Sequence, residues 1–314
     1  MKCTKFLSAA LAAACLYLSS SAIGAIIVND TWLDGTDSDP SQPVYSEQGA
    51  DTDLDGNIES LWYRGNEGTL DPVGPGGPLR ANMLGDATPS TTSSASYTTY
   101  FTSEAVPVTL ANVGDSIKVT WNFTTGDVNA SNTSQSFRFA LIDSASRLTN
   151  DGSPSGNATG YAIFGNMGET LGHGSSFNLK GRSGQGAILS AGGDWSTSLA
   201  NSGTNGNVGY ADNTAYSMVW TVTRNANDNH DISVSMTGGN LDGTGSITTT
   251  ALDVAPNGGS HSFDTFTIRP SQAAQTATIF DTSLFQVEYL SIPEPASLAL
   301  VGMSVLALMV RRQR

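Results

Sequence analysis

The segment DTDLDGNIE, residues 51–59, has the residue types and the spacing that bind a divalent cation. Asp51, Asp53 and Asp55 alternate, and in calcium loops the oxygen ligands at positions 1, 3 and 5 converge on one ion. Gly56 stands at position 6, where such loops turn sharply. The pattern therefore predicts a structural Ca²⁺ site, with a plain acidic turn as the alternative.

The second half of this segment departs from the usual calcium loop. Asn57 at position 7 offers its backbone carbonyl, but position 12 is Trp62 instead of a bidentate carboxylate. Glu59, or a carboxylate from elsewhere in the chain, would have to complete the coordination shell. The segments on either side of residues 51–59 lack the 3.6-residue apolar period of helices. The sequence thus predicts the ligand set Asp51, Asp53, Asp55, Asn57 and Glu59.

Other chemical constellations are weaker. His173, His230 and His261 are far apart in the sequence and no His-x-x-x-His pair occurs, so we expect no zinc site. The Gly-Asp-Ser of residues 114–116 directly precedes an apolar strand pattern and is predicted to be a tight turn. No two carboxylates alternate on one strand as a retaining glycosidase requires. We therefore expect no catalytic activity, with a glycoside hydrolase or polysaccharide lyase as the alternative.

Five aromatic residues stand in polar, loop-like surroundings and allow two interpretations. Exposed aromatic rings stack against the faces of sugars, which would make these residues a carbohydrate-binding platform. Alternatively, each ring is buried and closes an end of the fold. The residues are Trp32, Trp62, Tyr63, Trp195 and Tyr210.

The elements that would position these residues have the two-residue apolar period of half-buried strands. In IKVTWNFT, for example, Ile117, Val119, Trp121 and Phe123 share one face. Turn clusters rich in Gly, Asn and Asp separate such segments. We predict an all-β fold, an antiparallel two-sheet sandwich forming one domain over residues 26–290. The strand segments are 117–124, 136–143, 161–165, 216–223, 231–237 and 284–290, and the Pro- and Gly-rich stretch from Leu70 to Pro89 is predicted to be a long loop.

Residues 1–25 have the features of a secretory signal peptide, expected to be helical. Lys2 and Lys5 precede an apolar run, and small residues suit cleavage after Gly24 or Ala25. Both cysteines of the chain, Cys3 and Cys15, lie in this segment. We expect an exported mature protein without thiols or disulfides, stabilised by its core alone.

The charge of the body limits its partners. Of the 14 basic residues, five lie in the two terminal segments, as does one of the 28 acidic residues. The body therefore has 9 basic and 27 acidic residues and a net charge of −18. This sign excludes a phosphate-binding surface over the whole body, so we expect no nucleic-acid partner. It also supplies carboxylates for divalent cations.

The C-terminal segment, residues 291–314, combines a proline marker, a short apolar run and a basic end. Pro293, Glu294 and Pro295 cannot continue a strand, and Pro295 suits the first position of a helix. The run 296–310 would span about 22 Å as a helix, against about 30 Å for a hydrocarbon core. Arg311 and Arg312 would stop this short transmembrane helix on the cytoplasmic side.

This order of features resembles the PEP-CTERM sorting signal of Gram-negative bacteria that make extracellular polysaccharide. The matching residues are Pro293, Glu294, Pro295, Arg311 and Arg312. The resemblance implies that an exosortase-type processing protease cleaves the tail near the proline motif. It also implies transient anchoring in the inner membrane before release to the outer surface or the extracellular matrix.

More loosely, the body resembles concanavalin A-like jelly-roll domains. The segments that carry this likeness are VTLANVGDSIKVTWNF, FRFALIDS, FDTFTIRP and FDTSLFQVEYL. The two resemblances together imply an exported, non-catalytic component of the cell surface or matrix, with extracellular polysaccharide as its expected partner. A lectin-like carbohydrate-binding module and a polysaccharide-degrading enzyme remain the alternatives.

Overall fold

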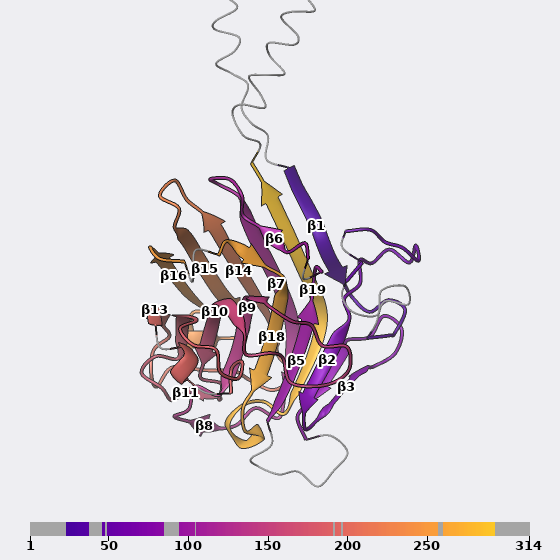
Figure 1. The fold of residues 1–314 in the computed structure, drawn as a ribbon. Coiled ribbons are helices and arrows are strands. Elements are labelled where there is room, and N and C mark those ends of the chain that lie inside the picture. The colour runs from indigo at the N-terminus through magenta and orange to yellow at the C-terminus, as the bar shows by residue number, and fades with distance from the viewer. Residues whose placement is uncertain are drawn as a thin grey trace, which may run out of the picture.

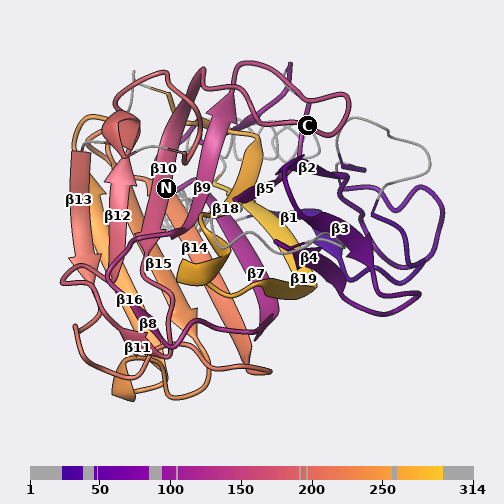
Figure 2. The same cartoon turned by 90° about the horizontal axis from the view of Figure 1, so that it is seen from below.

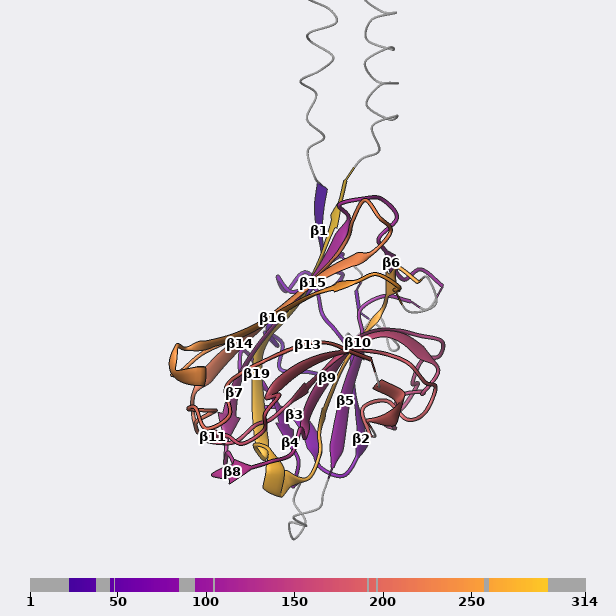
Figure 3. The same cartoon turned by 90° about the vertical axis from the view of Figure 1, so that its left-hand side faces the viewer.

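The segments with alternating apolar residues form strands, as predicted, and these strands build two antiparallel sheets packed face to face (Figures 1 and 3). The computed structural model describes residues 23–37, 46–47, 49–84, 94–103, 105–190, 192–195, 197–256 and 260–292. The predicted signal helix and C-terminal transmembrane helix lie outside these residues. No helix within the described part of the chain is long and apolar enough to cross a membrane.

The first sheet, called sheet A here, has eight strands, and all its pairings are antiparallel. The long central strand β19 has β7 on one side and, on the other, β4 beside its first half and β1 beside its second half. In spatial order the strands are β16 (Ser246–Asp253), β15 (His230–Thr237), β14 (Ala215–Arg224), β7 (Ser116–Gly126), β19 (Ile279–Ser291), β4 (Leu79–Asn82) and β3 (Thr69–Pro72), with β1 (Ile23–Asp30) joining β19.

The second sheet, sheet B, has seven antiparallel strands and lies over sheet A (Figure 2). Its order is β13 (Thr197–Ser202), β12 (Phe177–Gly181), β10 (Ala158–Gly165), β9 (Phe137–Ser144), β18 (Thr265–Pro270), β5 (Ala95–Tyr100) and β2 (Trp62–Asn66). Short pairs and turns complete the fold: β6 (Val108–Thr109) with β17 (Ser262–Phe263), β8 (Ser131–Asn132) with β11 (Thr170–Leu171), and the 3₁₀ turns η1 (Gly193–Trp195), η2 (Leu241–Gly243) and η4 (Ala273–Gln275).

An aromatic core fills the space between the sheets. Trp121 of β7 is fully buried and stacks on Phe123, with ring centres 4.0 Å apart. It also meets Phe139 and Phe266 of sheet B in edge-to-face contacts at about 6 Å, and its indole N–H donates to the Thr282 hydroxyl. Because these rings come from both sheets, burial of the alternating apolar face holds the two layers together.

A second, smaller apolar cluster lies on the other side of sheet B, away from sheet A. Ala140 and Ile142 of β9 and Phe164 of β10 project from that face, and Leu189 and Trp195 of the loop after β12 pack on them. This loop therefore covers part of the outer face of sheet B, and its backbone is fixed against the sheet.

The structure contradicts the prediction for one part of the sequence and adds a detail at the start of the body. The stretch from Leu70 to Pro89 is not one long loop, because β3 and β4 form a hairpin within it. Pro72 is tolerated there since β3 is an edge strand, where a missing N–H leaves no ladder bond unmade. Strand β1 also begins at Ile23, three residues before the predicted start of the body.

The start of β1 and the end of β19 lie side by side (Figure 1). Ile23 pairs with Ser291, and the pairing continues to Asp30 opposite Phe285. Cleavage after Gly24 or Ala25 would remove the first two or three residues of this ladder and leave the remainder of β1. The chain thus enters and leaves the sandwich at one end.

Candidate metal site

The acidic segment is a loop between β1 and β2 that is anchored to the end of β1. Asn29 and Ile58 form an antiparallel bridge, with N···O distances of 2.8 and 3.3 Å. The Glu47 N–H donates to the carbonyl of Glu59 at 3.2 Å, which closes the base of the loop. The loop is therefore held at both ends by backbone hydrogen bonds.

Within the loop, carboxylates organise the backbone. Asp51 accepts from the N–H groups of Leu54 and Gly56 at 2.6 and 3.0 Å. Gly56 has φ +99°, a conformation that favours glycine, which explains why this residue type stands at the sharp turn. The buried Glu47 side chain accepts from the Thr52 and Glu59 N–H groups at 2.5 and 2.9 Å.

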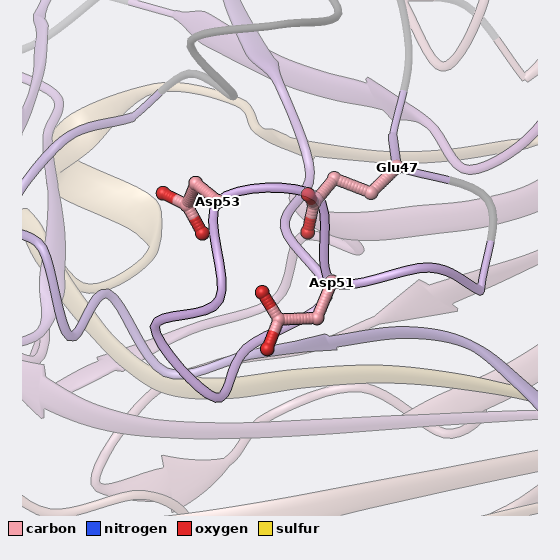
Figure 4. A group of neighbouring side chains, drawn as sticks. All are labelled: Glu47, Asp51 and Asp53. Carbon is pink, nitrogen blue, oxygen red and sulfur yellow. The ribbon is translucent and has the colours of Figure 1, made fainter.

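The carboxylates gather in two groups that share Asp53. In each group, one oxygen from every residue lies within 4.8 Å of the others. The first group is Glu47, Asp51 and Asp53, whose side chains Figure 4 shows around the loop. The second is Asp53, Asp55 and Glu59.

The hydrogen bonds distinguish the two groups. In the first, both oxygens of Glu47 and of Asp51 already accept N–H donors. In the second, Glu59 is only 3% exposed, and its Oε2 atom has no hydrogen-bond partner among the described residues. The Asp55 Oδ2 atom is likewise buried and without a partner there. Buried oxygens without hydrogen-bond donors lower the stability of the fold. The second group therefore needs a positive charge or a proton, which the described residues do not supply.

The pKa values of the buried carboxyl groups also indicate that a positive charge or a proton is needed here. Burial raises the pKa of Glu59 to about 9, and the negative charges of Asp34, Asp30, Asp53 and Asp55 add to the effect. Burial also raises the pKa of Asp30 to about 7, although the Trp32 and Ser60 N–H groups donate to its carboxylate. A divalent cation at this place would be attracted by every one of these groups.

The structure brings together most of the residues predicted from sequence. Asp51, Asp53, Asp55 and Glu59 all contribute to one of the two groups. The Asn57 side chain does not, because it is buried against Thr31 and hydrogen-bonds with the Thr31 hydroxyl at 2.8 Å. The sequence analysis did not identify Glu47, because it precedes the calcium-loop pattern. Its place beside the loop depends on the hydrogen bond from its N–H to the Glu59 carbonyl.

The structure decides between the two interpretations of the five aromatic residues. All five residues are at most 4% exposed, so their rings are not available to stack on a sugar. Trp62 packs edge-to-face on Phe285 at 5.2 Å, and Trp195 covers the outer cluster on sheet B. The alternative interpretation, burial, is correct for Trp32, Trp62, Tyr63, Trp195 and Tyr210.

Two of the histidines meet, contrary to the expectation from their separation in sequence. His230 Nε2 and His261 Nδ1 are 2.7 Å apart. On its other side, His230 Nδ1 lies 2.7 Å from the Tyr161 hydroxyl, which donates to Asp253 at 2.8 Å. His261 Nε2 in turn lies 3.1 Å from Asp228. The pairing of β15 with β16 and the position of β17 produce this chain, which the sequence gives no local sign of.

The comparison with known families concerns the tail. Residues 291–314 match the PEP-CTERM protein-sorting motif. This match confirms the resemblance drawn from the proline motif and the basic end, and it indicates an exported protein that is sorted to the cell envelope. The motif residues themselves, Pro293, Glu294, Pro295, Arg311 and Arg312, lie outside the described residues. No curated protein sequence matches the chain.

Solved structures that align with most of this chain include lectins. Winged bean acidic lectin, in complex with methyl-α-D-galactose, has 8% identity and a TM-score of 0.42, with 88% of this chain and 100% of that chain covered. Arcelin-5, a lectin-like defence protein from Phaseolus vulgaris, has 10% identity and a TM-score of 0.40, covering 74% and 93%. A mutant Emp46p carbohydrate recognition domain has 12% identity and a TM-score of 0.41, covering 72% and 87%.

Proposed function

We propose that this protein is an exported, non-catalytic component of the cell surface or extracellular matrix, which associates with extracellular polysaccharide after an exosortase-type protease has processed its tail. The observation that carries this proposal is the sorting motif at residues 291–314, joined without a spacer to β19. The motif supports export and processing of the tail, and the β-sandwich supports the role of a stable, non-catalytic domain at the cell surface.

The junction between body and tail suits such processing. The Ile292 N–H donates to the buried Asp115 carboxylate at 2.7 Å, so the folded body extends to the residue before Pro293. A cut near the proline motif would therefore release a complete sandwich. Until that cut, the short apolar run 296–310 would act as a temporary tether, because it is too short for comfortable permanent residence in a bilayer.

C-terminal mass spectrometry of the protein from its native host tests the route. We expect a mature form that ends near Pro293, while a variant with Pro293, Glu294 and Pro295 replaced by alanine keeps the whole tail. An intact Arg314 in the mature wild-type pool would overturn the proposal.

We also propose that the acidic loop binds Ca²⁺ through Asp53, Asp55 and Glu59, with the Asn57 carbonyl and water as further ligands. Two observations support this: Asp55 and Glu59 each have a buried oxygen without a hydrogen-bond partner among the described residues, and one oxygen from each of Asp53, Asp55 and Glu59 lies within 4.8 Å of the others. Calcium prefers six to eight oxygen ligands and tolerates irregular geometry, which suits this set. Its role would be structural, fixing the loop against the end of β1.

Isothermal titration calorimetry with CaCl₂ tests the metal site. We expect a saturable heat with the wild-type protein, a flat trace with Asp53→Ala, and an unchanged trace with Glu67→Ala, which removes an exposed carboxylate from the turn after β2. Flat traces for all three proteins would show that the loop does not bind calcium, and the sorting proposal would be unaffected.

A hollow of about 460 Å³ on the outer face of sheet A supports both the association with glycan and the absence of catalysis. Hydroxyl groups can hydrogen-bond to sugars, whereas glycosidase chemistry uses two carboxyl groups flanking the bond. The lining contains one carboxylate, that of Asp231. The lining residues are Thr221, Thr223, Asp231, Ile232, Ser233, Thr250, Ala251 and Leu252.

Incubation with the host's extracellular polysaccharide distinguishes the candidates. We expect the protein to be retained on the polymer without release of reducing or unsaturated ends. Release of such ends would favour the enzyme, and failure of retention would remove the glycan partner.

A further inference from the structure

The nine cationic side chains of the body fall into two classes. Because acidic residues outnumber them by 27 to 9, each cation is expected to have a carboxylate partner. Five do, in ion pairs of 2.5–3.0 Å: Arg64 with Asp151, Arg80 with Asp281, Lys118 with Glu288, Arg147 with Asp264 and Arg224 with Asp228. Burial lowers the pKa of a sixth, Arg182, and the nearby negative charge of Asp194 opposes this shift.

The remaining three cations share one surface, although they come from separate parts of the chain. Arg138 in β9, Lys180 in β12 and Arg269 in β18 lie on the outer face of sheet B, and all nine cations belong to the described residues. None of the three forms an ion pair with any described carboxylate. We call Arg138, Lys180 and Arg269 the cationic cluster.

The fold fixes Arg138 at the centre of this cluster. Arg138 and Arg269 are direct cross-strand neighbours, and both donate to the Leu189 carbonyl, at 2.7 and 3.4 Å. On the other side, the ring of Phe164 lies 4.7 Å from the Arg138 guanidinium carbon and 5.0 Å from Lys180 Nζ. Arg138 also donates to the carbonyls of Gln135 and Ser190, at 2.8 and 3.2 Å, and Arg269 donates to the Ser271 hydroxyl at 2.8 Å. The three positive charges are therefore held close together by a shared ring and by neutral oxygens.

The three charges repel one another, and the described residues offset this with neutral oxygens but with no carboxylate. Burial, together with the charge of Arg269, lowers the pKa of Arg138 to about 10. Burial and the charge of Arg138 lower the pKa of Lys180. No described carboxylate opposes these shifts, and Lys180 Nζ has no hydrogen-bond acceptor among the described residues.

We propose that the cationic cluster is a binding site for an oxyanion, which Arg138 and Lys180 hold over the edge of Phe164 with Arg269 as the flanking charge. Guanidinium and ammonium groups recognise carboxylate, sulfate and phosphate oxygens by charge-assisted hydrogen bonds. The three side chains are only partly buried, so the anion can be a free ion or a group on a longer ligand. The net charge of −18 does not prevent this, because salt screens it beyond about 8 Å under physiological conditions.

Calorimetric titrations at constant ionic strength test the site, with sodium sulfate and a polyuronate as the two probes and a neutral glucan as the control polymer. We expect saturable binding of at least one charged probe and none of the glucan. Binding of sulfate identifies a free anion as sufficient, whereas binding of the polyuronate alone assigns the site to acidic groups on a polymer.

Matched variants separate the site from general effects of charge. Lys180→Gln and Arg138→Gln should each weaken binding about tenfold or more, because each removes a charge-assisted hydrogen bond. Arg80→Gln changes the net charge equally but breaks an exposed ion pair elsewhere, and it should bind as the wild type does. Lys180→Gln is the cleaner test, since Arg138 also supports the loop through Leu189.

Two results would overturn the proposal. One is the absence of binding by both charged probes in the wild-type protein. The other is equal binding by the wild type, Lys180→Gln and Arg80→Gln. Neither result depends on calcium or on the sorting tail, so the proposals fail separately.

Discussion

Glu59 illustrates how one buried residue type can indicate a ligand. A carboxylate that is 3% exposed, with an unpartnered oxygen and four acidic neighbours, lowers stability unless a cation or a proton neutralises it. The alternating aspartates are visible in the sequence, but the burial of Glu59 is not. It follows from the bridge between Asn29 and Ile58, which presses the loop against β1.

We predict that Glu59→Gln stabilises the protein in the absence of calcium. With a pKa of about 9, Glu59 must take up a proton when the chain folds at pH 8, which costs free energy. The amide has nearly the same shape, stays neutral without this proton and supplies a donor to its acidic neighbours, so the free energy of unfolding at pH 8 should rise by about 1 kcal/mol or more. The same variant should lose the stabilisation that CaCl₂ gives to the wild type. Urea unfolding with EDTA and with CaCl₂ measures both. A less stable variant in EDTA would contradict the prediction.

His230 is the residue through which the stability should depend on acid. His230 has a polar neighbour at each ring nitrogen, the Tyr161 hydroxyl 2.7 Å from Nδ1 and His261 Nδ1 2.7 Å from Nε2. The ring is only 1% exposed, so water solvates a positive charge on it poorly. Burial lowers the pKa of His230 to about 4, helped by the neighbouring His261 and Arg224, while Asp253 and Asp228 act in the opposite direction.

The sign of the effect follows from linkage. Between about pH 4 and pH 6.5 the unfolded chain binds a proton at this position that the folded chain does not, so stability falls as the pH falls through this window. The loss from pH 7 to pH 4.5 should be about 2–3 kcal/mol from this group. His230→Gln should show a shallower pH dependence in urea unfolding than the wild type. Parallel curves for the two proteins would contradict the assignment to His230.

At the scale of elements, the end of β19 depends on one buried carboxylate in the turn before β7. Asp115 accepts from the N–H groups of Asn112 and Ile292, at 2.8 and 2.7 Å, and from the Tyr289 hydroxyl at 3.1 Å. The sequence predicted this Gly-Asp-Ser segment as a tight turn, and Gly114 indeed has φ +91°. Its second role, fastening the strand that leads into the sorting motif, requires contacts across about 170 residues of chain.

We predict that Asp115→Ala loosens this end without unfolding the body. Two backbone N–H groups lose their acceptor, while the Tyr289 hydroxyl keeps the Thr109 carbonyl, and the free energy of unfolding should fall by about 1–3 kcal/mol. Hydrogen exchange should accelerate in 285–292 and in the paired strand β1, while β9 and β10 keep their protection. Glu67→Ala serves as the control for loss of a carboxylate. Uniform acceleration across both sheets would argue against a local role.

How far the sequence predicts these elements depends on what each strand faces. Strands such as β7 and β14 bury one face and expose the other, so alternation identifies them directly. Strand β1 was assigned partly to the signal peptide because IGAIIVND is apolar at both faces near its start. Strand β3 contains only four residues and a proline, and it exists because β4 pairs with it. Pairing partners distant in sequence decide such strands, and single-segment patterns do not contain that information.

The whole molecule combines an acidic body with a local cationic cluster and two adjoining ends. Charge counting along the sequence gives the first of these features, since 27 acidic residues face 9 basic ones. It gives no indication of the second, because Arg138, Lys180 and Arg269 come from three strands and meet only through the order β12-β10-β9-β18. The two ends adjoin because β1 pairs with β19, and these strands are far apart in the sequence.

The pairing of the two ends can be tested by a disulfide, because residues 26–290 contain no cysteine. Asn29 and Gln286 are register partners, and the Gln286 amide donates to the Asn29 side chain at 2.8 Å. We predict that Asn29→Cys with Gln286→Cys forms a disulfide during export, since direct cross-strand partners lie within the Cα separation that a disulfide spans.

The cross-link should raise the free energy of unfolding by about 2–4 kcal/mol, because it closes most of the chain into one loop. Intact-mass analysis with and without reduction detects the bond. Asn29→Cys with Glu288→Cys, two residues out of register, should remain reduced. The bond also requires that β1 stays paired after the signal peptide is removed, so two free thiols in the exported in-register variant would show that β1 leaves β19 in the mature protein.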